Sequence, residues 1–397
     1  MSVRIYLNAL GIVSPLGVGK ESVAKALFAG SQDGMVEESD LLQEGKTFVG
    51  RVSAKLPKLS KEYFKYNCRN NRMTLLALQE IEDNIQSAIK TYGDDRIAVV
   101  LGTSTSGIGD NESGISHKVE TGKFPSDYHF ERQETASISN FVQKFYGLTG
   151  PALTVSTACT SGAKALASAC RMIRAGVCDA AIVGGCDSLC KLTLNGFKSL
   201  ESLSEELCQP LSKNRDGINI GEGGAFFLIS KDTGPVEVAG VGETSDAHHI
   251  SAPAPDGKGA IRAMEIALEK SNANADDVAY INLHGTATSL NDAMEAKAVS
   301  NVLRSDVPCS STKTMTGHML GAAGAVELGF LWLTLQDEYS KGQLPPHIWD
   351  GEADDEIAAL NFSNLTTKRH PDKRIMLSNS FAFGGNNICV ALRGGSK

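Results

Sequence analysis

The chain alternates short runs of β-branched and apolar residues with longer alanine-rich segments. Three of the apolar runs, at residues 96–101, 180–183 and 225–229, have the length and composition of strands buried on both faces. The segments between such runs are long enough to form helices. This alternation is typical of an α/β fold whose sheet is covered by helices on both sides.

A weak internal duplication relates the two ends of the chain. Residues 3–14 form a strand-like run that leads into a turn with glycine and serine, and residues 236–245 repeat this pattern. A Gly-Gly pair before the run ending at Ser230 is echoed by another before residues 388–392. We therefore predict two halves, 1–235 and 236–397, with a site where they meet. Residues 104–150 show few regular patterns, so we interpret them as an elaboration outside the core.

The composition narrows the possible classes of function. With 397 residues, of which 42% are hydrophobic, the chain is long enough to bury a large core. Its net charge of -8 argues against a nucleic-acid partner, because phosphate binding needs a basic surface. No stretch reaches the ~18 uncharged apolar residues of a membrane span. Nine cysteines without a signal sequence indicate reduced thiols in the cytoplasm. Cys186 and Cys190 lack a second pair at zinc-site spacing, so no metal site is expected.

The first segment with candidate chemistry surrounds Cys159. A strand-like run at residues 154–157 ends in small residues and continues into an alanine-rich stretch, which places Cys159 at or just before a helix N-terminus. Backbone N–H groups and the helix dipole there favour a thiolate, and would lower the pKa of the thiol from ~8.5 towards neutrality. Cys159 is thus a candidate nucleophile; a buried structural cysteine is the alternative.

Two histidines occupy similar positions in the second half of the chain. His284 ends a short apolar run at residues 280–283, and a polar cluster at the carboxyl end of a strand is where α/β folds place ligands. His318 lies in a small-residue turn that leads into a helix. A cysteine nucleophile and two histidine donors could together act on a thioester.

A glycine-rich turn near the chain end adds a fourth segment. Gly384 and Gly385 follow Phe383, and two glycines allow backbone N–H groups to approach a ligand closely, as an oxyanion hole requires. A double glycine is weak evidence by itself, because turns of every kind use glycine.

Taken in this order, the four segments resemble the β-ketoacyl-acyl-carrier-protein synthases of the thiolase superfamily, of the cysteine-histidine-histidine type. The resemblance covers nearly the whole chain, and includes residues 11–17 and 215–224. It implies a duplicated thiolase-like five-layer α-β-α-β-α sandwich, usually in a homodimer with pockets near the interface.

The resemblance also implies roles for particular residues. Cys159 would be the nucleophile, and its backbone N–H would form an oxyanion hole with that of Phe383. His284 and His318 would donate hydrogen bonds to the malonyl thioester carbonyl. Lys313 and Glu327 would orient His318 and its surroundings, unless they form a simple ion pair. Residues that would contact the phosphopantetheine arm, bind substrate or gate the acyl pocket are Thr286, Thr288, Phe381, Phe383, Gly384 and Gly385.

The implied reaction is a ping-pong decarboxylative condensation. An acyl group moves from its carrier to Cys159, and malonyl carrier then loses carbon dioxide and attacks the acyl-enzyme. The partner would be an acyl carrier protein that delivers 4′-phosphopantetheine, with no cofactor bound to the chain itself. A basic run with helical spacing would steer the acidic carrier, or would simply be a solvated helix face. Its members are Lys61, Lys65, Arg69 and Arg72.

Two departures from the usual family pattern affect the expected pathway. Ser289 stands where a proline usually follows Thr288, and Asn386 stands where a threonine usually follows the two glycines. We therefore favour a specialised polyene or polyketide-like pathway over housekeeping fatty acid synthesis, and a heterodimer with a related chain-length subunit becomes an alternative to the homodimer.

Two competing functions share the fold. A non-catalytic chain-length subunit typically loses the nucleophile, which this chain retains. A degradative thiolase would carry a second catalytic cysteine near its C-terminus, and Cys389 lies too far along the chain to fill that role convincingly.

Overall fold

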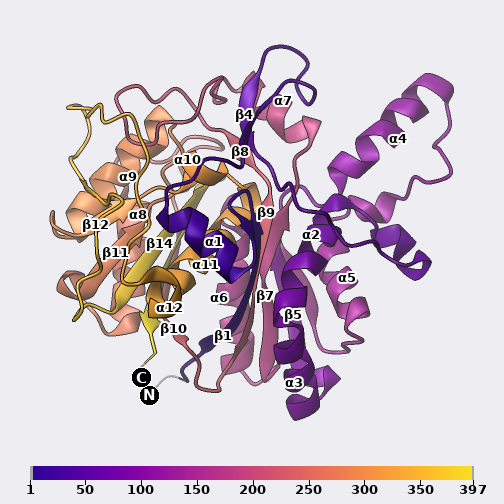
Figure 1. Cartoon of the computed structure of the whole chain (residues 1–397), viewed down its shortest axis with the longest axis horizontal. Helices are drawn as coiled ribbons and strands as arrows, with labels where there is room; N and C mark the ends of the chain where they lie inside the picture. The colour runs from indigo at the N-terminus through magenta and orange to yellow at the C-terminus, as the bar shows by residue number, and fades with distance from the viewer. Residues whose placement is uncertain (1–2, 396–397) are drawn as a thin grey trace.

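A single 12-stranded sheet runs through the computed structural model, which describes residues 3–395. The three apolar runs predicted as strands are confirmed, since they form β5 (Ile97–Gly102), β7 (Ala180–Asp187) and β9 (Gly223–Ser230). The segments expected to be helical separate them. The two described ends of the chain lie close together at one edge of the molecule (Figure 1).

The sheet consists of two halves with the same topology. The strand order β1-β9-β7-β5-β6 in the first half is repeated as β10-β15-β14-β11-β12 in the second. In each half the first three strands pair antiparallel and the last three pair parallel. The halves join where β1 pairs with β10. The predicted duplication is therefore confirmed at the level of strand order and direction.

The remaining strands have short or intermediate lengths. Those of the main sheet are β1 (Tyr6–Ser14), β2 (Gly17–Val18), β6 (Ala152–Val155), β10 (Val236–Ser245), β11 (Val278–Asn282), β12 (Pro308–Ser310), β13 (Asn361–Phe362), β14 (Ile375–Ala382) and β15 (Asn386–Gly394). A separate small sheet contains β3 (Met35–Glu38), β4 (Thr47–Gly50) and β8 (Ile220–Gly221).

Helices cover both outer faces and fill the space between the halves. The longer ones are α1 (Lys20–Phe28), α2 (Arg69–Leu78), α3 (Glu82–Tyr92), α4 (Ile108–Thr121), α5 (Ser137–Phe145), α6 (Ser161–Arg174), α7 (Lys191–Ser199), α8 (Lys258–Ser271), α9 (Ser289–Val302) and α11 (Ala323–Leu335). Short helical turns are α10 (Lys313–Thr316), α12 (Asp337–Ser340), η1 (Lys61–Tyr66), η2 (Gln79–Ile81), η3 (Asp94–Arg96), η4 (Phe130–Arg132), η5 (Ala275–Asp277) and η6 (Leu320–Ala322).

The hydrophobic core has three main parts, which define five layers. Helices α6 and α11 share one cluster of buried side chains with strands from both halves, so they form the middle layer. Helices α2, α3 and α5 pack on the outer face of the first half, and α8 and α9 on that of the second. This is the duplicated α-β-α-β-α sandwich expected from the sequence.

The middle layer has a simple sequence cause. Helix α11 is apolar on all sides, and every one of its 13 residues is buried. Helix α6 approaches it closely because the residues at the contact are small: a Cβ added at Gly162 would lie 2.8 Å from the Cβ of Ala325. The two half-sheets can therefore pack on opposite sides of one closely packed pair of helices.

The region at residues 104–150 only partly fits the sequence-based interpretation. Helix α4 projects away from the body of the molecule, as an elaboration would (Figure 1). Helix α5, in contrast, buries Ile138, Phe141 and Val142 in the core of the first half. The expectation that the whole region lies outside the core was wrong for α5. No helix within residues 3–395 is both long and apolar enough to cross a membrane.

The contact between α6 and α11 generates a prediction about stability. Gly162→Ala places a methyl group against Ala325, and overpacking of this kind costs about 1–3 kcal/mol. Gly196→Ala in α7 is the matched control, because an added Cβ there meets nothing within 4 Å and alanine is the better helix former by roughly 0.5–1 kcal/mol. Thermal denaturation should show a lower Tm for Gly162→Ala and an equal or higher Tm for Gly196→Ala. Equal Tm values for Gly162→Ala and wild type would contradict the close packing.

Candidate active site

Cys159 lies in a tight turn between β6 and α6. The preceding residue, Ala158, has a φ of 50°, which is unusual for a residue other than glycine. Its carbonyl accepts hydrogen bonds from the hydroxyls of Ser161, at 2.6 Å, and Ser104, at 3.3 Å. Helix α6 begins at Ser161, so the thiol precedes the helix N-terminus by two residues, as predicted. The turn is held in a strained conformation that presents the thiol to the cavity.

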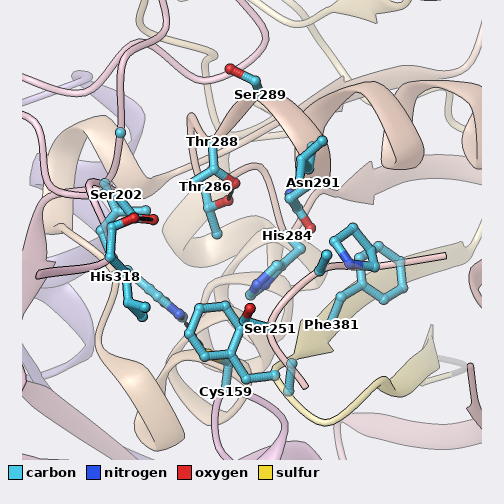
Figure 2. A pocket seen from close by; sticks show the side chains of 18 of the residues that line it. Cys159, Ser202, Ser251, His284, Thr286, Thr288, Ser289, Asn291, His318 and Phe381 are labelled. Carbon is cyan, nitrogen blue, oxygen red and sulfur yellow. Dashed lines mark hydrogen bonds between the residues drawn. The ribbon is translucent and has the colours of Figure 1, made fainter. Parts of the chain in front are cut away.

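His284 and His318 face this thiol from the second half of the chain. The Nε2 atom of His318 lies 2.9 Å from Sγ of Cys159, and the two imidazole rings are 5.2 Å apart and nearly perpendicular. Figure 2 shows both rings pointing towards Cys159. The three side chains are buried, and one ligand atom from each lies within 4.8 Å of the others. The tertiary structure therefore brings together three residues that are separated by up to 159 positions.

Burial determines the protonation states at this cluster. It lowers the pKa of both imidazoles well below 6.5, and the nearby Lys313 ammonium lowers them further, so both rings are neutral near pH 7. A neutral ring has one N–H to donate. Burial also raises the pKa of the Cys159 thiol to about 12, although Lys313 opposes this. This direction is opposite to the expected pKa near neutrality, because desolvation of the thiolate outweighs the Lys313 charge and the backbone hydrogen bond that favour it.

The buried pair of Lys313 and Glu327 contacts the backbone of His284. The Nζ atom of Lys313 lies 2.5 Å from Glu327 and also donates a hydrogen bond to the backbone carbonyl of His284. Both side chains of the pair are 2% exposed. Burial raises the pKa of Glu327, and the ammonium opposes the rise. The pair thus bonds the loop of His284, while its predicted role in orienting His318 and its surroundings stays a prediction.

Two carboxylates that the sequence interpretation missed hold the loop after β11. Glu295 accepts hydrogen bonds from the backbone N–H groups of His284, at 2.8 Å, and Gly285, at 2.7 Å. Asp292 accepts one from the N–H of Thr286 at 3.0 Å. Burial raises the pKa of Glu295 to about 7. Both lie near the N-terminus of α9, three positions apart, so their side chains share one face of that helix. This spacing was the signal in the sequence for both.

A third missed carboxylate connects the loop beside Cys159 to the start of the middle-layer helix. Asp187 is fully buried, and its Oδ1 accepts hydrogen bonds from the hydroxyls of Thr103 and Thr105. Its Oδ2 accepts one from the N–H of Ala322, just before α11. Ser104, in the same loop, donates to Ala158. The positions of Cys159 and His318 thus depend on one buried carboxylate.

A cavity of about 330 Å³ opens onto the cluster. Thr286 and Thr288 line its wall, with their hydroxyl oxygens 2.9 Å apart, and Phe381 packs its ring edge-on against His284. Phe383 also lines the cavity, is 38% exposed, and lies 5.7 Å from the ring of Phe197. The predicted arm, substrate and gate side chains therefore surround one opening, together with Phe197, which the sequence interpretation did not single out.

The turn after Phe383 is held by contacts on three sides. Gly384 and Gly385 have φ of 81° and 74°, values that favour glycine, and the N–H of Gly384 donates to the carbonyl of Ile250 at 2.7 Å. Asn387 donates to Asp246 at 2.6 Å. Asn386 accepts a hydrogen bond of 2.8 Å from Lys164 of α6. The asparagine that departs from the usual family pattern thus ties this turn to the helix that follows Cys159.

The basic run predicted to dock a carrier does not form one helix. Lys61 and Lys65 belong to η1, which ends at Tyr66, and α2 begins only at Arg69. Lys65 pairs with Glu131 at 2.7 Å, whereas Arg69 pairs with the fully buried Glu222 at 2.5 Å. The Nε of Arg72 donates to the carbonyl of Pro57. The expected helical continuity was wrong; the docking role itself stays a prediction.

The cysteine and two histidines have the geometry of a three-ligand metal site, and their residue types suit a soft cation such as zinc. Their surroundings favour a different use. The Lys313 ammonium acts on the cysteine and on both histidines and would repel a cation. The cluster is therefore better suited to nucleophilic attack and hydrogen-bond donation.

Comparison with known proteins agrees with this geometry. Residues 3–233 match the N-terminal domain of the β-ketoacyl synthase family, and residues 236–348 match its C-terminal domain. The chain is 32% identical to 3-oxoacyl-[acyl-carrier-protein] synthase 2 of Vibrio harveyi over 97% of both chains. It is 32% identical to the Staphylococcus aureus protein of the same name, over 82% of this chain and 84% of the other.

A solved structure is more similar still. The ketosynthase ApeO, in complex with its chain length factor ApeC from Xenorhabdus doucetiae, is 42% identical, with a TM-score of 0.93 over 99% of this chain and 98% of the other. The family match extends over both halves of the duplicated fold, and the site residues come from both. The chain belongs to the β-ketoacyl synthase family.

Proposed function

We propose that the chain catalyses the decarboxylative condensation of an enzyme-bound acyl group with malonyl-acyl-carrier protein, to give a β-ketoacyl-carrier product. The observation that carries this proposal is the buried cluster in which two neutral imidazoles face the thiol of Cys159. The 3-oxoacyl-[acyl-carrier-protein] synthase relatives support the same reaction class.

The first half-reaction loads the nucleophile. Sγ of Cys159 attacks the acyl thioester, the new S–C bond forms, and the thiol proton passes to the departing carrier thiol. Neutral His318, whose Nε2 lies 2.9 Å from Sγ, is placed to donate a hydrogen bond that stabilises the thiolate as the proton leaves. The backbone N–H groups of Cys159 and Phe383 would stabilise the developing oxyanion.

The second half-reaction forms the carbon–carbon bond. Malonyl carrier loses carbon dioxide, and the electron pair left behind becomes an enolate whose oxygen accepts hydrogen bonds from His284 and His318. The enolate carbon attacks the acyl-enzyme carbonyl, the bond to Sγ breaks, and the thiolate takes up from solvent the one proton that the overall reaction consumes. Neutral imidazoles suit this step, because a hydrogen-bond donor in a dry site stabilises charge where it develops.

The carrier would deliver substrate through its 4′-phosphopantetheine arm. Thr286 and Thr288 line the cavity mouth with adjacent hydroxyl groups, which are suited to the amides of that arm. Within the predicted docking set, Lys61 of η1 is exposed, and the side chain of Lys65 in the same turn is 39% exposed although it pairs with Glu131, so both would be accessible to an acidic carrier.

Two observations support a partner and a pathway: the departures from the usual family pattern and the similarities to known proteins. The identity to ApeO, a ketosynthase solved with its chain length factor, is higher than to the 3-oxoacyl-[acyl-carrier-protein] synthase 2 relatives, and supports a heterodimer with a chain length factor rather than a homodimer. The two departures at Ser289 and Asn386 support a specialised polyene or polyketide-like pathway. The duplicated topology supports the division at 235/236; the outermost residues of these halves, 1–2 and 396–397, lie outside the described range. Nine free, buried cysteines support a reducing compartment such as the cytoplasm.

The competing functions receive less support. A non-catalytic chain-length subunit would not need the strained turn and the buried cluster around Cys159. A degradative thiolase would need a second cysteine at the cavity, and Cys389 instead lies buried within β15, in the core of the second half.

Intact-mass spectrometry tests the proposed reaction directly. Wild type and Cys159→Ala are each incubated with a panel of acyl carriers and then with malonyl carrier, in the presence and absence of a chain length factor. We expect an acyl adduct on wild type alone, followed by release of an elongated β-ketoacyl carrier. Adducts of equal yield on Cys159→Ala, or none on folded wild type with any carrier, would refute the proposal.

The raised pKa of Cys159 predicts how its reactivity depends on pH. Since thiolate is the reactive form, alkylation by iodoacetamide should accelerate by about tenfold per pH unit between pH 7 and 9 without reaching a plateau. The rate is measured from the mass of the adduct, with Cys159→Ala as background. A plateau below pH 8 would show that the helix N-terminus outweighs burial.

Substitutions in the Lys313–Glu327 pair should change the stability of the protein and its condensation rate independently. Lys313→Met leaves a buried carboxylate without its partner, and should cost about 3–5 kcal/mol of unfolding free energy. Lys313→Met with Glu327→Leu removes both charges and should recover most of the Tm, but not the condensation rate, because the hydrogen bond to the His284 carbonyl is still missing. Full recovery of the rate in this double variant would show that the pair is only structural.

A further inference from the structure

His347 lies outside the cavity, yet both of its ring nitrogens contact loops that shape the site. It follows Pro345 and Pro346 and is 5% exposed. Its Nδ1 accepts a hydrogen bond from the backbone N–H of Ser311 at 3.1 Å, and its Nε2 lies 3.1 Å from the carbonyl oxygen of Pro210. One imidazole therefore bridges two segments that are about a hundred residues apart.

The tautomer of this ring follows from its partners. A backbone N–H can donate only to a nitrogen with a free lone pair, so Nδ1 is unprotonated and the single N–H lies on Nε2, where it donates to Pro210. Burial lowers the pKa of His347 to about 4, so the ring is neutral near pH 7. Phe362 stacks on it at 4.2 Å with an interplanar angle of 18°. Both polar edges and one face of the imidazole are thus in use.

The first arm of the bridge leads to the catalytic histidine and lysine. The hydroxyl of Ser311 donates to the carbonyl of Gly285 at 2.7 Å, and accepts a hydrogen bond from the N–H of Lys313 at 3.3 Å. Gly285 is the residue after His284. The Nδ1 side of His347 therefore holds Ser311, whose hydroxyl bonds both the loop after His284 and the N–H of Lys313.

The second arm leads to the predicted arm-binding threonine. Leu211 follows Pro210, has a φ of 61°, and donates its N–H to Asp292 at 2.7 Å. Asp292 in turn accepts the N–H of Thr286 at 3.0 Å. Because Gly285 and Thr286 are neighbours, the two arms close into a ring of hydrogen bonds around the loop that carries His284.

We propose that His347 is a positioning residue that fixes the His284–Thr286 loop from both ends, with its Nδ1 side setting decarboxylation and its Nε2 side setting carrier-arm binding. This inference rests on the proposed condensing function for its kinetic consequences, but the positioning itself is a property of the fold. It explains why a buried histidine occupies a site that touches no substrate.

Three substitutions separate the two arms. In His347→Asn the amide oxygen can take the place of Nδ1 as acceptor for Ser311, whereas in His347→Gln the amide N–H can take the place of Nε2 as donor to Pro210. His347→Phe keeps an aromatic ring for Phe362 to stack on and loses both hydrogen bonds. His370→Asn is the matched control, because His370 is an exposed histidine remote from this ring of hydrogen bonds.

The kinetic readout is the split between kcat and KM for malonyl-carrier decarboxylation. We expect His347→Asn to raise KM and leave kcat near wild type, His347→Gln to lower kcat and leave KM near wild type, and His347→Phe to change both. Misplacement of a reacting group by about 1 Å can cost up to about a hundredfold in rate, so losses of ten- to a hundredfold are expected. His370→Asn should match wild type. Unchanged kcat and KM in all three variants would overturn the proposal, as would equal losses in both parameters that merely follow a falling Tm.

Amide hydrogen exchange provides a readout that does not require synthase activity. In His347→Asn, exchange should accelerate at residues 211–212 but not at 309–313; in His347→Gln, the reverse should hold; in His347→Phe, both should accelerate, with 284–287 following. If wild type proves inactive yet this pattern appears, the proposed function fails and the positioning role stands. If wild type is active and exchange is unaltered in all three variants, the positioning role fails.

Discussion

The close approach of α6 and α11 is the constraint on which the rest of this structure depends. Cys159 lies two positions before the start of α6 and His318 lies five positions before the start of α11, so the distance between these helices sets the distance between thiol and imidazole. Only very small residues at the contact, with Gly162 facing Ala325, allow the two helix starts to come so near. The same pair of helices separates the two half-sheets, and so the active site and the fold share one packing contact.

The active site lies beside the contact between α6 and α11, and its burial determines the charge states of the cysteine and the two histidines. Far from water, both histidines are neutral, and the cysteine is a thiol at rest. The Lys313 ammonium bonds the His284 loop, and Glu327 compensates its charge. The result is a site of neutral donors with a positive charge behind them, which is suited to stabilising an enolate rather than a cation.

Several backbone N–H groups near the reacting atoms are held by buried carboxylates. Glu295 and Asp292 bind the loop after β11, and Asp187 binds the loop beside Cys159. His347 continues this arrangement with a neutral ring that bonds two further loops. Irregular backbone at the centre of a protein needs such partners, because an unpaired buried polar group is costly. The loops can therefore carry functional side chains without becoming loose.

The sequence by itself determined the α/β class, the duplication and the identity of the cysteine and histidines. These conclusions rest on the spacing of apolar residues, on turns of small residues and on residue type, all of which can be read from neighbouring positions in the chain. It did not reveal that α5 enters the core, that the basic run is broken between η1 and α2, or that Lys313 bonds the loop of His284. It also suggested a lowered thiol pKa, which the depth of burial reverses. Nor did it single out Glu295, Asp187 or His347, whose partners lie up to 137 positions away along the chain. Burial and long-range hydrogen bonds depend on which segments pack together in three dimensions, so only the tertiary structure could decide them.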